Sequence, residues 1–235
     1  MAKARTIIKR RKAVQNIRKI TRTMQLIATA RYQAAFTRAT KTRPYTEHIT
    51  RLVERVARHQ KELEHPLLRV NTESGRSVLI MITSNRGLCG GYNASLMRAS
   101  RDAYRALKER SDQVNIFAVG RKLISYLKFH RLEVWRRDDR LADNPLYADV
   151  EALASELIDA YQRRTIDSVH VTYMKFISVG LQRVETIQLL PIEPPAAAEE
   201  ENSDNAVEWE FIPSAQALLA QLLPEMVKVR LFQCF

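Results

Sequence analysis

The first 43 residues place the strongest constraint on the fold. Residues Lys3–Arg43 contain neither glycine nor proline, and good helix formers dominate the segment. At ~1.5 Å per residue, they form a helix on the order of 60 Å long, which exceeds the usual length of a helix in a globular domain. Pro44 either kinks this helix or begins a second one, whose apolar periodicity stops near His65 and Pro66.

This helix carries a narrow apolar stripe, which indicates a helical partner. The stripe approximates a seven-residue repeat of the coiled-coil kind, interrupted by Arg10, Thr21 and Arg31. Small alanines along it favour close approach of another helix over burial in a broad core. Its members are Ile7, Val14, Ile17, Ile20, Met24, Ile27, Ala28, Ala34 and Ala35.

The positive charge of the chain is concentrated in the same segment. The net formal charge is +12, but Met1–His65 has 17 basic and 4 acidic residues, whereas the remainder has 21 and 22. The first acidic residue is Glu47. A one-sided charge of this kind repels itself, so the helix is expected to meet an anionic partner surface.

The rest of the chain predicts an α/β domain. Strand-like runs at 77–83, 114–119 and 131–135 alternate with helical stretches at 94–109, 121–130 and 146–164, which favours a mostly parallel sheet covered on both faces. Two further runs, 168–175 and 183–190, predict a hairpin that adds an antiparallel edge strand. An acidic surface loop at 193–205, a last strand at 209–212 and a helix capped by Ser214 and disturbed by Pro224 complete the expected order.

A glycine-rich loop follows the first strand of this domain, where phosphate-binding loops are found. Its glycines, at positions 87, 90 and 91 within Ser84–Asn93, match neither the dinucleotide nor the P-loop spacing, so a structural tight turn is the favoured interpretation. Cys89 has no histidine near it in sequence, which favours a packed, unreactive thiol over a nucleophile. A small α/β enzyme that uses this loop is the alternative.

Other candidate sites are weaker. Asp138, Asp139 and Asp143 lie among arginines 136, 137 and 140 and are interpreted as a solvated charged turn. Histidine and cysteine spacing predicts no metal site, and we expect no cofactor. The second cysteine, Cys234, lies far from the first, which makes a disulfide framework improbable. The sequence shows neither a signal peptide of the usual form nor ~20 consecutive apolar residues, so any membrane association is expected to be indirect.

The basic helix also allows a second function, nucleic-acid binding. Residues Lys9–Lys12 could engage phosphates, since DNA-binding basic regions are long helices. Such proteins, however, place their basic region beside an uninterrupted leucine zipper, and no leucine heptads follow here.

Two segments, Gln15–Arg31 and Ser84–Asn93, resemble the signatures of ATP synthase gamma subunits. The first is similar to the I-[TR]-K-I-T-K-A-M segment of that family, and the second to its S-D-R-G-L-C-G loop. Further agreement comes from Arg43–Tyr45, Gln188–Pro191 and the stretch from Leu222 to Val229, so the resemblance extends over essentially the whole chain.

The resemblance implies a Rossmann-like mixed-sheet domain with terminal helices that pair as an antiparallel coiled coil. It implies a shaft at 1–65, a foot domain at 77–212 and the start of a second shaft helix at 213–235. It implies a non-catalytic rotor stalk inside the ring of alpha and beta subunits, with a foot that meets the epsilon subunit and the proton-carrying c-ring. The location implied is the cytoplasmic face of a bacterial inner membrane or, as an alternative, an organellar inner membrane.

The resemblance also assigns roles to individual residues. It implies that the alpha/beta ring is contacted by Lys9, Arg10, Lys12, Arg18, Lys19, Arg22, Met24 and Gln25. It implies a structural role in the foot domain for Arg86, Gly87, Cys89, Gly90, Gly91 and Asn93. No nucleic acid and no direct membrane insertion are implied.

The sequence departs from the family pattern in three places. Asn85 stands where the family usually has aspartate, and Gln25 where glutamate is common in bacterial members. Family members also continue well beyond the position of Phe235, so the sequence predicts a truncated second shaft helix and leaves a non-functional gamma fragment as an alternative.

Overall fold

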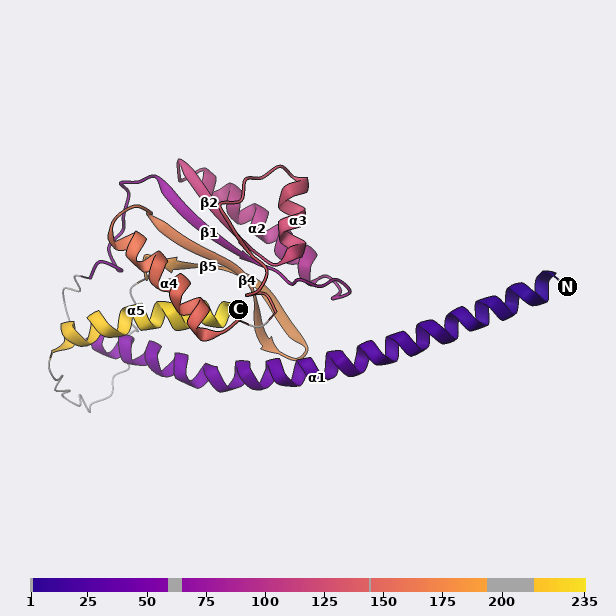
Figure 1. Ribbon diagram of the computed structural model, residues 1–235. Helices are drawn as coiled ribbons and strands as arrows, with labels where there is room; N and C mark the ends of the chain where they lie inside the picture. Colours follow the sequence, from indigo (N-terminus) through magenta and orange to yellow (C-terminus); the bar gives the residue numbers. More distant parts are fainter. Residues whose placement is uncertain (1, 59–64, 144, 194–213) are drawn as a thin grey trace. The chain divides into compact units, whose positions relative to one another are not determined.

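The computed structural model describes residues 2–58, 65–143, 145–193 and 214–235 (Figure 1). The chain divides into two compact units, Met1–Tyr45 and Thr46–Phe235. The expected acidic loop, apart from Glu193, and the expected strand at 209–212 lie outside the described residues. The shaft and foot boundaries expected from the sequence remain predictions.

The first unit consists of the greater part of one helix, α1 (Ala2–Arg58). The expected long helix is present, and the alternative in which Pro44 begins a second helix is wrong, because α1 continues through it. Pro44 has no N–H to donate to the carbonyl of Thr40, which lies one turn earlier. The hydroxyl groups of Thr21 and Thr29 donate back to the carbonyls of Ile17 and Gln25 at 2.9 Å, so these polar side chains are satisfied within the helix.

The second unit is built around a five-stranded sheet with the order β3-β2-β1-β4-β5 (Figure 1). The strands are β1 (Arg76–Ile82), β2 (Gln113–Val119), β3 (Arg136–Asp138), β4 (Ser168–Ser178) and β5 (Leu181–Leu190). The first four run parallel, and β5 pairs antiparallel with β4 as the edge of a hairpin. The mixed sheet and its antiparallel edge are therefore confirmed.

The third strand lies later in the sequence than predicted. Residues 131–135 form a turn and a connection, and pairing with β2 begins at Arg136. Leu132 and Val134 face the core below α3 instead of entering the ladder, which explains why their apolar character resembled that of a strand. The expected solvated turn around Asp138, Asp139 and Asp143 is wrong in its first part, since Arg136–Asp138 form the edge strand β3, whereas residues 139–143 are bends and turns.

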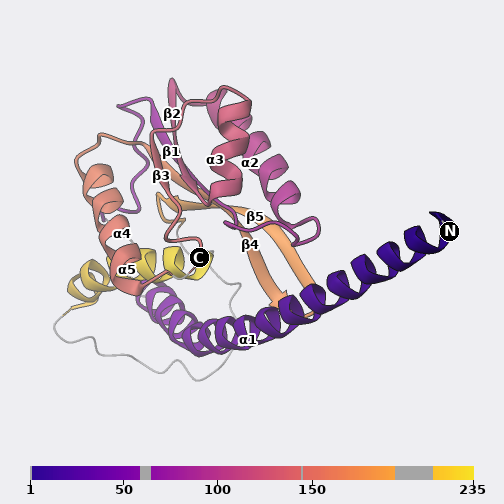
Figure 2. The same ribbon diagram turned by 45° about the vertical axis from the view of Figure 1, so that its right-hand side comes forward.

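Helices cover both faces of the sheet (Figure 2). On one face lie α2 (Tyr92–Lys108) and α3 (Arg121–Phe129), over a core that contains Leu79 and Met81 of β1. The alternate side chains of β1, Val78 and Ile80, face a larger core under α4 (Tyr147–Gln162) and α5 (Ala215–Cys234). Because buried residues succeed one another along β1, the strand lacks the polar–apolar alternation of a half-exposed strand.

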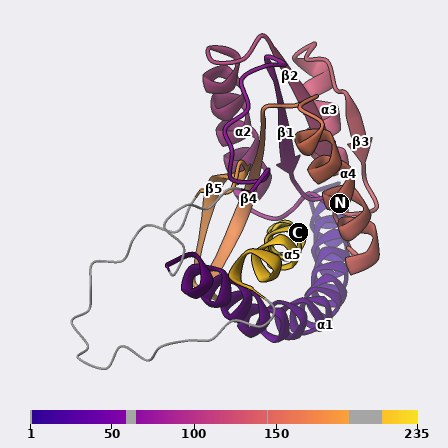
Figure 3. The ribbon, with the colours of Figure 1, turned by 90° about the vertical axis from the view of Figure 1, so that its left-hand side faces the viewer.

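The larger core also includes the last turns of α1. Ile49, Val53 and Val56 are at most 5% exposed and belong to the same buried cluster as Leu219 and Leu223 of α5. The end of α1 and the whole of α5 are therefore anchored in the body of the α/β unit (Figure 3).

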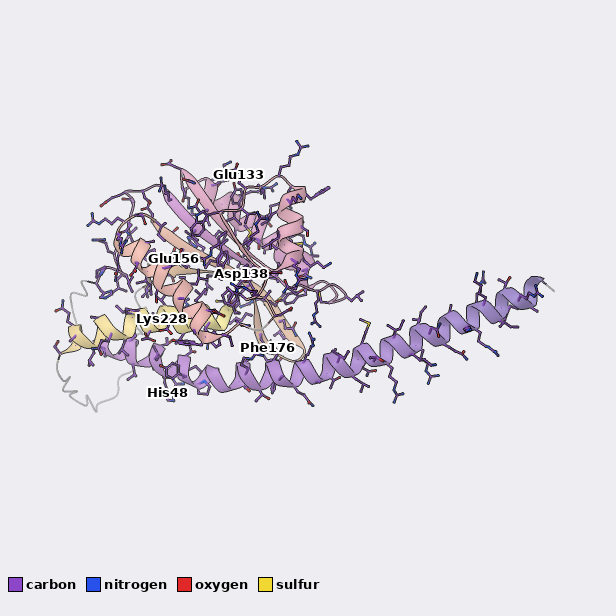
Figure 4. All side chains as sticks on the ribbon, in the orientation of Figure 1. His48, Glu133, Asp138, Glu156, Phe176 and Lys228 are labelled. Carbon is purple, nitrogen blue, oxygen red and sulfur yellow. The ribbon has the colours of Figure 1, made fainter. Side chains whose placement is uncertain are left out.

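Helix α5 begins at the predicted cap. The Ser214 hydroxyl accepts a hydrogen bond from Ala217 N at 3.2 Å, and the helix continues past Pro224. Lys228, labelled in Figure 4, donates to Glu225 at 2.6 Å and to Glu151 of α4 at 3.0 Å. The hydrogen bond to Glu225 is the main reason that the pKa of Lys228 lies above its ordinary value. The ammonium group thus ties α5 to α4.

Gly120 joins β2 to α3 in a conformation that other residues rarely adopt. Its φ is +98°, and a Cβ atom there would lie 2.4 Å from the carbonyl oxygen of Thr83. We predict that Gly120→Ala lowers the free energy of unfolding by about 3 kcal/mol, measured by urea denaturation. Gly180→Ala is the matched control, because a Cβ atom there meets nothing within 4 Å. Equal stability of the two variants would contradict the prediction.

Candidate partner-binding helix and glycine-rich loop

The residues expected to contact a surrounding ring lie together on α1 in the first unit. All eight, from Lys9 to Gln25, are exposed. No ion pair joins the cations among them to another described residue, since the nearest carboxylate in sequence is that of Glu47. The structure thus leaves these cations available to an outside partner.

The cations surround the helix and do not form a single face. Successive residues of an α-helix are turned by about 100°, so the run Lys9–Lys12 presents positive charge in four directions. A partner that neutralised all four would need to reach more than one side of the helix. This distribution favours an enclosing surface over a flat one.

The apolar stripe of α1 is uncovered among the described residues. Ile7, Val14, Ile17 and Ile20 are each at least 59% exposed, and Met24 is 45% exposed. A continuous line of exposed branched side chains is costly in water, at roughly 25 cal/mol per Å² of apolar surface. The stripe is therefore also expected to bind a partner. Because its apolar side chains follow a line along one helix, a second helix would cover them better than a broad sheet would.

The glycine-rich loop between β1 and α2 is held by its own side chains. Asn93 Oδ1 accepts hydrogen bonds from the N–H and the hydroxyl of Ser84, both at 3.1 Å. Asn93 Nδ2 donates to Arg86 O at 2.9 Å and contacts Cys89 Sγ at 3.1 Å. The amide thus occupies the space inside the turn, where a phosphate group lies in a phosphate-binding loop.

The outer part of the loop projects into solvent in a strained conformation. Leu88 has a φ of 62° and is 91% exposed, and Gly90 has a φ of 59°. A left-handed conformation is uncommon for leucine and costs on the order of 1–3 kcal/mol. The loop is therefore a shaped, self-bonded turn whose tip presents an apolar side chain.

Asn85 links this loop to the neighbouring strand and helix. Its Oδ1 accepts from Arg121 N at 2.9 Å, and its Nδ2 donates to the backbone carbonyl of Asp139 at 2.6 Å. The Arg121–Asp139 ion pair, at 2.9 Å, lies beside it. An aspartate could accept from Arg121 but could not donate to Asp139, so the amide has a bonding role of its own.

The two cysteines differ in a way that the sequence did not predict. Cys89, expected to be packed, is exposed, although its thiol lies 3.1 Å from Asn93 Nδ2 and 3.8 Å from Arg86 O within the loop. Cys234 is buried in α5, and burial raises the pKa of its thiol to about 12. Both thiols are free.

The carboxylates around β3 are engaged in local structure. Asp138 accepts from the N–H groups of Arg140 at 2.7 Å and Leu141 at 3.3 Å. A cavity of about 240 Å³ lies next to it, and the Arg136–Glu156 ion pair at 2.6 Å forms part of its wall. Within the described part of the chain, no three histidine, cysteine, aspartate or glutamate side chains are grouped to hold a metal ion.

Among the described helices, none combines the length and the apolar character that a bilayer span requires.

The chain is similar over nearly its whole length to subunits of ATP synthases. The family model described as ATP synthase matches residues 3–235. The structure is similar to a chain in the central stalk and c-ring structure of the Tetrahymena thermophila mitochondrial ATP synthase, with a TM-score of 0.59 over 92% of this chain and 90% of that chain. At 17% identity, that similarity concerns the fold alone.

Curated relatives give the particular family. The chain is 41% identical to the ATP synthase gamma chain of Rhodopirellula baltica, over 100% of this chain and 81% of that protein. It is 34% identical to the ATP synthase gamma chain of Desulfitobacterium hafniense, over 99% of this chain and 79% of that protein. The chain belongs to the ATP synthase gamma chain family.

The self-bonded loop makes a prediction for Asn93. Asn93→Ala removes both acceptor contacts with Ser84, so we expect the free energy of unfolding to fall by about 2 kcal/mol and amide exchange over residues 84–92 to become faster. Asn93→Asp keeps the acceptor and loses only the donor, so its loss should be smaller. Unchanged exchange in the alanine variant would show that the loop is held by other contacts.

The cysteines make a second prediction. At pH 8, Ellman's reagent should react rapidly with one thiol per native chain, because Cys89 is exposed while Cys234 is buried with a raised pKa. The second thiol should react only after denaturation. Cys89→Ser should abolish the rapid phase, and a rapid phase that persists in this variant would mean that Cys234 is accessible.

Proposed function

We propose that this chain is the central rotor stalk of an F-type ATP synthase. It couples rotation of an ion-driven c-ring to conformational cycling of the catalytic beta subunits, and it performs no catalysis itself. Family membership supports this role, and so does the structure of α1, whose exposed cations face several directions. The ion that drives rotation is a proton in this proposal.

The shaft acts through contacts that attract without interlocking. Positive side chains around a helix are attracted to carboxylates at any rotational angle, whereas a close-packed apolar interface would favour one angle. The rod therefore stays centred in a ring of alpha and beta subunits while turning. Since a single rod lacks the three-fold symmetry of such a ring, each beta subunit meets a different side of it and favours a different conformation.

Ring contact is proposed for Lys9, Arg10, Lys12, Arg18, Lys19, Arg22, Met24 and Gln25, all exposed on α1. Gln25 and Met24 supply uncharged contacts in this set, so the ring surface that they meet need not be acidic. The foot is the α/β unit, which we propose meets the epsilon subunit and the c-ring. The loop at Ser84–Asn93 is proposed to maintain the shape of the foot.

The expected location follows from these partners. The chain is held at a membrane through the c-ring, as a peripheral subunit. The relatives from Rhodopirellula baltica and Desulfitobacterium hafniense support the cytoplasmic face of a bacterial inner membrane.

Retention of the chain by a ring of alpha and beta subunits tests the proposal. We expect the ring from Rhodopirellula baltica, whose gamma chain is 41% identical, to retain the chain at 50 mM salt and to release it progressively as salt rises. Lys9→Gln/Arg10→Gln/Lys12→Gln should weaken retention about tenfold, because each exposed charge pair contributes ~0.2–1 kcal/mol.

The matched control removes the same charge from the second unit. Arg76, Arg137 and Arg163 are exposed there, and their replacement by glutamine should leave retention unchanged. Equal retention of the parent chain and the α1 variant, at every salt concentration, would overturn the proposed role of these cations.

A further inference from the structure

The two helical layers of the α/β unit carry opposite charge. Helix α2 has four cations and one acidic residue, and α3 has three cations and no acidic residue. On the other face of the sheet, α4 has four carboxylates and no cation. The near-neutral total charge of residues 66–235 therefore conceals a basic α2–α3 layer and an acidic helix α4.

The cations of α2 form a single stripe. They occur at Arg98, Arg101, Arg105 and Lys108, with the spacing i, i+3, i+7 and i+10 that places residues on one face of a helix. The buried residues Leu96 and Ser100 lie on the opposite face. Arg98, Arg105 and Lys108 therefore point away from the sheet along about 15 Å of helix, whereas Arg101 is half-buried and its Nε is buried without a hydrogen-bond partner.

This stripe is barely neutralised within the chain. Arg98, Arg105 and Lys108 are exposed and form no ion pair with any described residue. Arg101 lies 3.9 Å from Asp102 Oδ1, at the outer limit of an ion pair. By contrast, two of the four carboxylates of α4 are engaged, since Glu156 pairs with Arg136 and Glu151 with Lys228.

We propose that the outer face of α2 is a docking surface for an acidic helix of a partner protein. Carboxylates with the same i, i+3, i+7, i+10 spacing on a second helix would lie opposite the four cations, and arginine binds carboxylates with two parallel hydrogen bonds. Exposed Lys122 and Lys128 of α3 extend the positive field beside the stripe.

The composition of the stripe favours a protein over a membrane. Beside the cations, the exposed positions of α2 hold Ala94, Asp102 and Ala106, so α2 offers no large apolar side chain for insertion into lipid. The surface belongs to the α/β unit, so the inference does not depend on the rotor role proposed for α1.

Binding of two designed peptides tests this surface. Both are fluorescent 21-residue alanine-based helices with four glutamates. One has them at i, i+3, i+7 and i+10, and the other has the same composition with the glutamates spread around the helix. At 50 mM salt we expect the full chain to bind the striped peptide about fivefold more tightly than the scattered one. Helix α1 has cations on several sides and should bind both alike.

Charge reversal on α2 identifies the surface. Arg98→Glu/Arg105→Glu should abolish the preference, while Arg137→Glu/Arg163→Glu, with the same change in net charge at exposed positions elsewhere, should keep it. A photoreactive group at the centre of the striped peptide should crosslink to α2. Circular dichroism and the urea midpoint establish whether the variants fold. If Arg98→Glu/Arg105→Glu does not fold, Arg98→Gln/Arg105→Gln replaces it.

Three outcomes would overturn the proposal. The first is a parent chain with no preference between the peptides, and the second is a preference that survives charge reversal on α2 or crosslinks that map elsewhere. The third concerns the Arg98→Glu/Arg105→Glu variant. If it loses more affinity for phosphatidylglycerol vesicles or duplex RNA than for the striped peptide, the stripe binds phosphate groups.

Discussion

The burial of the last turns of α1 in the core of the α/β unit is the interaction on which the proposed mechanics depend. Ile49, Val53 and Val56 pack into the cluster that also holds Leu219 and Leu223 of α5. At roughly 1.5–3 kcal/mol for each fully buried aliphatic side chain, these five residues contribute far more than any exposed ion pair in the chain. Force applied to one helix is therefore resisted by the core, and Lys228 adds a charged link from α5 to α4.

Charge is distributed in two ways on this chain, and the two suit different contacts. On α1 the cations surround the helix, so attraction to an acidic collar changes little as the helix turns. On α2 they lie on one face, so attraction is strongest in one orientation and fixes a partner in place. A rotor needs both kinds of surface, one that slides past its neighbours and one that holds subunits turning with it. The total of +12 does not distinguish them.

Much of the fold could be predicted from the sequence because its signals are local. The glycine-free N-terminal segment, the apolar run of β1 and the Ser214 cap each depend on residues close in the chain. The third strand was misplaced because Leu132 and Val134 pack against α3, and only the tertiary structure distinguishes an apolar connection from a strand. Exposure of Cys89 was likewise not predictable, since it depends on which side of the turn faces the solvent.

For the candidate sites, the sequence drew attention to segments whose roles remain predictions, and it did not reveal the long-range bonds within them. Asn85 stood out only as a departure from the family pattern, and its bonds to Arg121 and Asp139 span 36 and 54 positions in sequence. The spacing of the α2 cations is present in the sequence. The total charge of the C-terminal part does not reveal it, because the carboxylates of α4 cancel the charge of the α2 cations.

The glycine-rich loop shows why a sheet of this kind need not be an enzyme. Parallel α/β sheets bind ligands at the carboxyl ends of their strands, where the chain order reverses, and here that point lies between β1 and β4. The loop after β1 fills its own interior with the Asn93 amide, which takes the backbone N–H of Ser84 that an anion would otherwise bind. A phosphate would have to displace an amide that makes two acceptor and two donor contacts within hydrogen-bond distance. The same strand–loop–helix unit that binds nucleotides in other proteins is therefore closed by its own side chain here.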